Sequence, residues 1–289
     1  EAEIEANTTN ANSLSLQDIF FRFKWRILFT WLAVIFEAIV FLLFPLAMGY
    51  AMDSLIEESN IGLIVLASLG GLSLLIGSGR RFYDTRIYAG IYATTAPELV
   101  DKERSRDTDV STISARTGLV AELVEFFENS IPEIVNSLIG LIGALGIILY
   151  LNLQVFFACI VTTVLIVLVY AVTSKRTYRL NSGYNQELEE QVKTISNAES
   201  RDVTAHFKRL ARWNIRLSDL ETGNFSVSWI LLTALLVYSI FAIIGNDSAS
   251  QGDVLAVLMY VFNYIEAVIM LPYFYQQLVR LQEIAHRVK

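Results

Sequence analysis

The sequence predicts an all-α fold, that of a polytopic membrane protein with six transmembrane helices. Three observations lead to this prediction. Five long stretches contain almost no charged residue, all 22 Lys and Arg residues fall on one side of the membrane that these stretches define, and short acidic loops alternate with long charged segments between them. Composition agrees, because 54% hydrophobic residues and a mean hydropathy of +0.48 are higher than soluble domains usually show.

The lengths of the stretches give the number of spans. A bilayer core of about 30 Å needs roughly 20 helical residues. The longest stretch, residues 134–174, therefore holds two spans that turn near Leu151 to Gln154. We expect the six spans at about 27–52, 61–79, 134–151, 154–174, 222–246 and 254–279.

The first 26 residues precede these spans. Residues 1–13 are expected to form a polar tail. Residues 14–26 place Leu16, Ile19, Phe20 and Phe23 on one helical face, which is typical of an interfacial helix lying among the lipid headgroups. The alternative is that these residues only lengthen the first span.

Charge sets the expected orientation. Basic residues precede span one, lie between spans two and three and between four and five, and follow span six, whereas the other three loops have none. The positive-inside rule then places both termini in the cytoplasm, with the chain in the inner (plasma) membrane. The formal net charge of -7 follows this distribution and does not indicate a nucleic-acid partner.

The two long charged segments, residues 80–133 and 175–221, are expected to form helical hairpins. Apolar residues at helical spacing predict helices that continue roughly 30 Å beyond the membrane. We expect the turns at Pro97 to Asp107, where a proline is followed by a dense charge run, and at Ser200 to Asp202, where Ser-Arg-Asp is a helix-start signal.

This arrangement of six spans, long inner helical hairpins and short outer loops resembles the transmembrane domain of exporter-type (type IV) ABC transporters. Local likeness lies in Asp109-Val-Ser-Thr-Ile-Ser-Ala-Arg116 with the later Pro132, in Gln251-Gly-Asp-Val-Leu-Ala, and in Leu271-Pro-Tyr-Phe-Tyr-Gln-Gln-Leu. The resemblance implies a homodimer in which spans four and five cross to the partner. It also implies two coupling-helix regions, one around Pro97, Asp101 and Arg104 and one around Ser200, Asp202 and Phe207.

The 289 residues contain no Gly-x-x-x-x-Gly-Lys-Ser/Thr phosphate loop. Three explanations stay open: a transporter without an ATPase, a subunit that recruits a separate ATPase, and a fragment. An exporter-type plan with acids in the membrane is similar to the SbmA/BacA peptide-uptake family, homodimers thought to use the proton gradient. We expect no enzymatic activity and no cofactor.

The candidate site starts from two carboxylates near the membrane midplane, Glu37 in span one and Glu266 in span six. A carboxylate there costs about 2.5 kcal/mol or more unless it is paired, hydrated or protonated, and no basic residue is expected within reach. Protonation or a cationic ligand is the expected compensation, as a proton-coupled carrier requires. The expected proton and substrate pathway comprises Glu37, Glu266, Glu133, Glu128, Asn263, Tyr264 and Tyr260.

Aromatic residues crowd spans one and six beside these acids, and the outer loops are acidic. This favours a cationic substrate that is peptide-like or an amphipathic organic molecule, although the same rings could pack only against lipid and other helices. No cluster of His, Cys and acidic residues has the spacing of a metal site. Two alternatives to the proton-coupled carrier remain: an ATP-driven transporter whose ATPase is separate or deleted, and a membrane scaffold or regulatory subunit.

Overall fold

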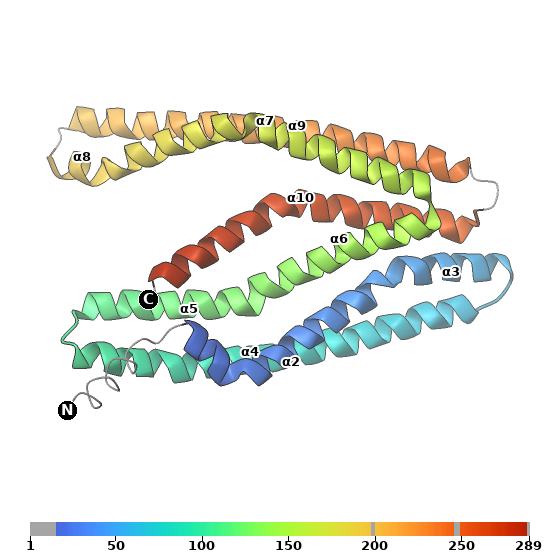
Figure 1. Cartoon of the computed structure of the whole chain (residues 1–289), viewed down its shortest axis with the longest axis horizontal. Coiled ribbons are helices and arrows are strands. Elements are labelled where there is room, and N and C mark those ends of the chain that lie inside the picture. The colour runs from blue at the N-terminus through green and yellow to red at the C-terminus, as the bar shows by residue number, and fades with distance from the viewer. Residues whose placement is uncertain (1–15, 198–199, 246–248, 288–289) are drawn as a thin grey trace, which may run out of the picture. The chain divides into compact units, whose positions relative to one another are not determined.

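The computed structural model describes residues 16–197, 200–245 and 249–287, and every regular element in these ranges is a helix. The expected tail, residues 1–13, lies outside the described residues. In chain order the elements are α2 (Leu16–Leu42), α3 (Phe44–Ile56), α4 (Ile61–Ser105), α5 (Val110–Glu125), the π-helix η1 (Phe126–Ser130), α6 (Ile131–Leu151), α7 (Leu153–Glu189), α8 (Gln191–Asn197), α9 (Ser200–Ile244) and α10 (Gln251–Arg287) (Figure 1).

Six helical segments of the described chain are long and apolar enough to cross a membrane, as the sequence predicts: Arg22–Ile56, Ile61–Ser105, Val110–Leu151, Leu153–Ser196, Arg201–Ile244 and Gln251–Val279. Many large apolar side chains on them are exposed, for example Leu75, Ile142 and Phe241. Apolar exposure of this extent identifies surfaces that lipid or another protein covers. The all-helical polytopic fold is thus confirmed.

The chain divides into two compact units. Unit 1 comprises Glu1–Ile147 and Ala249–Lys289, and unit 2 comprises Ile148–Ser248. In unit 1, α2 and α3 run antiparallel to α4, α4 packs on α5, and α10 packs on α3 and α5. Unit 1 has two distinct ends. The short-loop end carries residues 57–60 and the start of α10, and the basic end carries the turn between α4 and α5.

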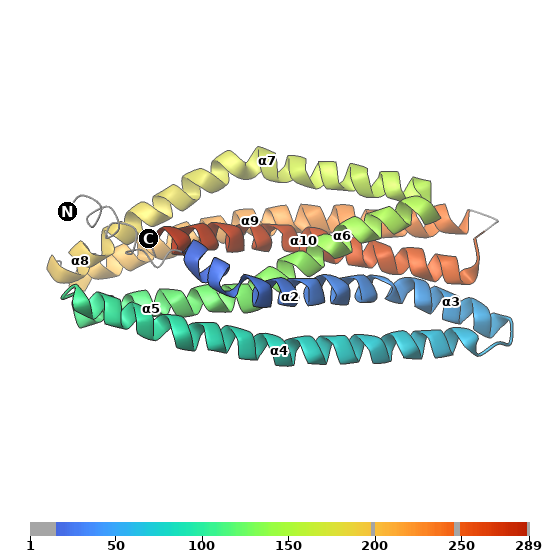
Figure 2. The same cartoon turned by 60° about the horizontal axis from the view of Figure 1, so that its bottom comes forward.

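The first span consists of two helices. Leu43 separates α2 from α3, and the Leu43 N–H reaches back to the Val40 carbonyl at 3.2 Å. Pro45 causes the interruption, because it lacks the N–H that would bond the fourth carbonyl before it. At the other end of α2 no helix boundary occurs at Arg26, although the first turns of α2 bend away from the rest in both views (Figures 1 and 2). The interfacial position of these turns stays a prediction.

The third span contains a π-helix, η1, between α5 and α6. Pro132 is the second residue after η1 and has no N–H to donate to the Glu128 carbonyl, so the wider turn accommodates a lost α-helical bond. The structure therefore loosens the helix one turn before Pro132, with Glu128 inside the loosened turn and Glu133 just after it.

Unit 2 is a long hairpin of α7 and α9, with the short α8 at its tip. Asn152 begins α7 and accepts a hydrogen bond from the Val155 N–H at 3.0 Å, so this turn falls where the sequence predicts it. Gly183 lets the two helices approach, since a Cβ there would lie 2.8 Å from the Trp213 ring. His206, buried on α9, is 2.8 Å from the Glu187 carboxylate on α7.

Candidate functional site

Unit 1 encloses a cavity of about 410 Å³ between α2, α4, α6 and α10. Three carboxylates reach it from three helices. Its lining comprises the acidic side chains of Glu37, Glu133 and Glu266, the polar side chains of Ser73, Asn136, Ser137, Asn263 and Tyr273, and the apolar residues Ala38, Phe41, Leu42, Gly140, Ala267, Met270 and Phe274.

The lining contains no Lys, Arg or His. Three acids around one partly enclosed space make its potential negative, and low-dielectric walls strengthen that potential. The rings of Phe41, Tyr273 and Phe274 add faces that attract a cation. The cavity is therefore chemically suited to an organic cation.

Four of the seven residues expected in the pathway meet in this cavity: Glu37, Glu133, Glu266 and Asn263. The other three do not line it. Glu128 lies in the π-helix, whose extra residue per turn changes the helical register between Glu125 and Glu133. Tyr260 and Tyr264 are fully buried, and the Tyr260 hydroxyl donates to the Leu42 carbonyl at 2.7 Å.

The expectation that Glu37 has no basic residue within reach is wrong. Arg80 on α4 donates from Nε to Glu37 Oε2, and from Nη1 to Asp84 Oδ2 at 2.7 Å. The guanidinium is nearly buried, with 10% of its side chain exposed, against 17% for Glu37 and 3% for Asp84. One cation thus bridges two carboxylates, and the group of three keeps one net negative charge when all are ionised.

The rest of α4 makes room for this arrangement. Gly77, one turn before Arg80, faces the other oxygen of Glu37, since a Cβ on Gly77 would lie 2.8 Å from Oε1. Buried hydroxyls of Thr30 and Tyr88 lie near Asp84 without a hydrogen bond of normal geometry to it. Glu37 therefore lies at the boundary between the cavity and a buried polar layer that joins α2 to α4.

Three contacts join α10 to α2 and α3 between the cavity and the short-loop end. The first is the Tyr260 hydrogen bond to Leu42. In the second, the backbones of Gly49 and Gly252 approach so closely that a Cβ on Gly49 would lie 2.5 Å from the Gly252 carbonyl oxygen. In the third, the Asp53 carboxylate accepts from Ser250 Oγ and from the Gly252 N–H, both at 2.7 Å. We call these contacts the short-loop seal.

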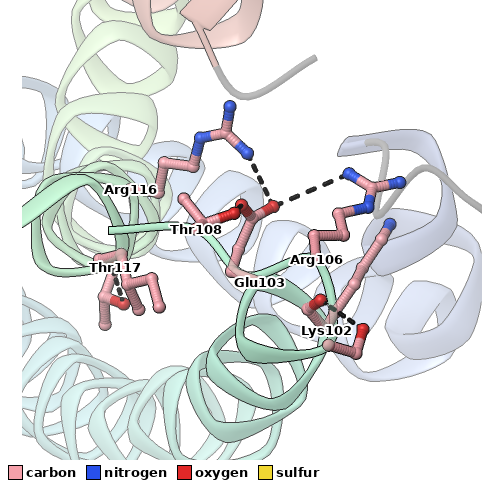
Figure 3. Close-up of polar contacts among 8 residues, drawn as sticks. Lys102, Glu103, Arg106, Thr108, Arg116 and Thr117 are labelled. Carbon is pink, nitrogen blue, oxygen red and sulfur yellow. Dashed lines mark hydrogen bonds and ion pairs between the residues drawn. The ribbon is translucent and has the colours of Figure 1, made fainter. Parts of the chain in front are cut away.

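The turn at the basic end is centred on Glu103. Its carboxylate, 3% exposed, accepts from Arg116 Nη1 at 2.6 Å and from Thr108 Oγ1 at 3.0 Å, and Arg106 lies 3.8 Å away. Figure 3 shows Arg106 and Arg116 reaching the same carboxylate from opposite sides. One acid thereby ties the end of α4 to the first turns of α5.

The turn differs from its expected position. Pro97, Asp101 and Arg104 all lie within α4, which continues past the proline to Ser105. The chain reverses only at residues 106–109, where Asp107 adopts a left-handed φ of 59° and the Thr108 N–H bonds the Glu103 carbonyl. Asp109 then begins α5 by accepting from the Ser111 N–H at 3.0 Å.

The second expected coupling region lies at the start of α9 in unit 2. Ser200 is the first residue of α9, as the helix-start signal indicates, and Asp202 is in the first turn. Phe207 is about half exposed. Sequence reasoning did not identify the nearby Glu187 carboxylate. Its Oε1 lies 2.8 Å from His206 Nδ1 and accepts a hydrogen bond from Arg209 Nε at 2.7 Å. In the part of the chain that is described, no three His, Cys, Asp or Glu side chains are arranged so that they could hold a metal ion.

The sequence matches a protein-family model. The family model described as ABC transporter transmembrane region matches residues 16–252, from the first described turn of α2 to the start of α10. This range includes Glu37, Arg80 and Glu133. No curated protein matches the chain.

Proposed function

The chain belongs to the ABC transporter transmembrane region family, and from this premise we propose that its cavity in unit 1 binds an amphipathic or peptide-like organic cation and carries it across the membrane. One observation supports this substrate class above all others: three carboxylates and no basic side chain line the cavity. A volume of about 410 Å³ is in the usual range for small organic ligands. The chain itself would bind and move its substrate without converting it.

Glu133 and Glu266 are the acids on which we base the coupling mechanism. Among the described residues neither forms an ion pair, unlike Glu37. An ionised carboxylate within a membrane is costly unless something neutralises it. A cationic substrate does so when bound, and a proton does so after the substrate has left. Exchange of the cation for protons follows from this alternation, and the proton gradient would drive it.

A second candidate is transport driven by an ATPase on another chain or domain. Family membership favours it, and so does the turn at Glu103, because a rigid turn at the end of two long helices is suited to transmit force from a bound partner. In both cases we propose a homodimer in the inner membrane, with the basic ends in the cytoplasm. The SbmA/BacA likeness stays a prediction.

Two probes of equal shape and opposite charge test the substrate class. Purified protein in lipid nanodiscs should bind tetraphenylphosphonium saturably, above empty nanodiscs, and should not bind tetraphenylborate. Glu133→Gln and Glu266→Gln should each weaken cation binding, whereas Glu125→Gln, at an exposed acid outside the lining, should not. Equal binding of both probes, or of neither, would contradict the proposal.

Flux measurements separate the two energy sources. In proteoliposomes an imposed pH gradient alone should drive tetraphenylphosphonium movement if the proton mechanism holds. If movement requires an ATP-hydrolysing partner together with ATP, the second candidate is correct.

A further inference from the structure

We propose that Arg80 is a tethered counter-ion, which pairs with Glu37 while the cavity is empty. A cationic substrate displaces the Arg80 guanidinium from Glu37, and the guanidinium then pairs with Asp84 alone. This inference rests on the proposed cation binding and names the residue that sets the affinity of the cavity for the cation. Arg80 does not line the cavity.

The geometry gives Arg80 two separate attachments. Its Nε donates to Glu37 on the neighbouring helix, and its Nη1 donates to Asp84 one turn along its own helix. Loss of the first bond leaves the second intact, so the guanidinium stays paired and buried when Glu37 turns to another cation. Asp84 is thus the fixed anchor and Glu37 the exchangeable partner.

Glu37 is in a position to exchange Arg80 for a cation in the cavity. It is the most exposed of the three groups and the only one that lines the cavity. Its carboxylate stands over Gly77, where no side chain confines it. A small rotation of the Glu37 side chain therefore suffices to face a ligand, without any movement of α2 or α4.

The charges make the exchange reversible. A substrate must be bound and then released, and a carboxylate that holds a cation in a low-dielectric site releases it slowly. Arg80 offers Glu37 a replacement cation at fixed distance, so it lowers the affinity of the empty site for substrate and favours release. Its effect must operate through Glu37.

The test removes the buried pair as a unit. In Arg80→Gln/Asp84→Asn neither side chain is left as an unpaired buried charge, which limits loss of stability. Tetraphenylphosphonium is a permanent cation, so its binding can be measured at about pH 9, where free carboxyl groups are ionised. We expect roughly tenfold tighter binding than wild type, equivalent to about 1.4 kcal/mol.

Three further variants identify the cause. Arg81→Gln removes the same charge from the adjacent, exposed position and should leave affinity unchanged. Arg80→Lys keeps the charge and should not produce the gain. Adding Glu37→Gln to the double variant should abolish the gain, because the carboxylate that the loss of Arg80 frees is then absent as well.

The outcomes distinguish this inference from the function on which it rests. If wild type binds tetraphenylphosphonium no better than tetraphenylborate, the substrate proposal itself fails. Thermal melting establishes that Arg80→Gln/Asp84→Asn is folded. If wild type prefers the cation but this folded variant binds tetraphenylphosphonium no more tightly than wild type does, Arg80 is not a competitor. A gain that persists in the presence of Glu37→Gln would likewise overturn the proposed route.

Discussion

Glu37 and Arg80 lie at equal distances along the chain from the turn that joins their helices. Glu37 is nineteen residues before Ile56, the end of α3, and Arg80 is nineteen residues after Ile61, the start of α4. In an antiparallel helix pair with equal rise per residue, such positions stand opposite each other. The ion pair between them is therefore a consequence of the short loop, residues 57–60.

The short-loop seal yields a stability prediction. Gly49→Ala should destabilise the protein by about 2 kcal/mol, because its Cβ would meet the backbone carbonyl of Gly252, which cannot turn aside as a side chain does. Gly71→Ala on α4 is the matched control, since nothing lies within 4 Å of its Cβ position. Thermal unfolding in detergent measures both. Equal melting temperatures for the two variants would show that the seal is not tightly packed.

The carboxylate of the seal can be tested separately. Asp53→Ala leaves Ser250 Oγ and the Gly252 N–H without their acceptor at the start of α10, and should cost about 1–2 kcal/mol. Glu57→Ala, in the adjacent loop, removes an exposed acid and should cost little. Hydrogen exchange at residues 252–256 should rise in the first variant only. Unchanged exchange there would remove Asp53 from the seal.

Two acids in ion pairs at the basic end of unit 1 should differ in their contributions. Glu103 is buried among Arg116, Arg106 and Thr108, whereas Glu98 pairs with Arg22 on the surface, where both side chains are about half exposed. Glu103→Gln should therefore cost about 3 kcal/mol and Glu98→Gln under about 1 kcal/mol. Protease cleavage near Val110 should increase in Glu103→Gln alone. The reverse ranking would show that the turn does not depend on Glu103.

The expected orientation has a direct test. A cysteine at Glu57 should react with a membrane-impermeant reagent in intact cells, whereas one at Ser105 should react only after the membrane is opened. The native Cys159 is buried and should stay unlabelled in both. Labelling of Ser105→Cys in intact cells would reverse the predicted topology.

Much of the fold could be predicted from hydropathy and charge, because a bilayer requires long apolar helices and leaves few other solutions. The length of the uncharged stretch at 134–174 predicted the turn at Asn152, and the Ser-Arg-Asp helix-start signal predicted the start of α9 at Ser200. The turn was expected too early, at Pro97, because a proline weakens a helix without obliging it to end. The real turn had its own signal in Asp107-Thr-Asp109, a left-handed residue followed by a helix cap.

The site was predictable in part. Depth along each helix suffices to bring Glu37 and Glu266 to the same level, and the structure places Glu133 and Asn263 with them. Sequence reasoning missed Arg80 because it is the first charged residue after the second span, which assigned it to the charged segment outside the membrane. Counting from the short loop instead would have set it opposite Glu37. Burial of Tyr260 and Tyr264 follows from helix rotation, which hydropathy alone does not specify.

Glu266 lines the cavity and forms no ion pair in the described structure. Glu266→Gln keeps the shape and the hydrogen-bonding capacity of the side chain but removes its titratable proton. Its cost to stability should be small, under about 1 kcal/mol, because the ionised form was the expensive one. In proteoliposomes, tetraphenylphosphonium flux driven by a pH gradient should fall at least tenfold per folded protein. Glu125→Gln should keep wild-type flux. Wild-type flux from Glu266→Gln would remove this carboxylate from the coupling mechanism, whereas loss of folding would identify it as a structural acid.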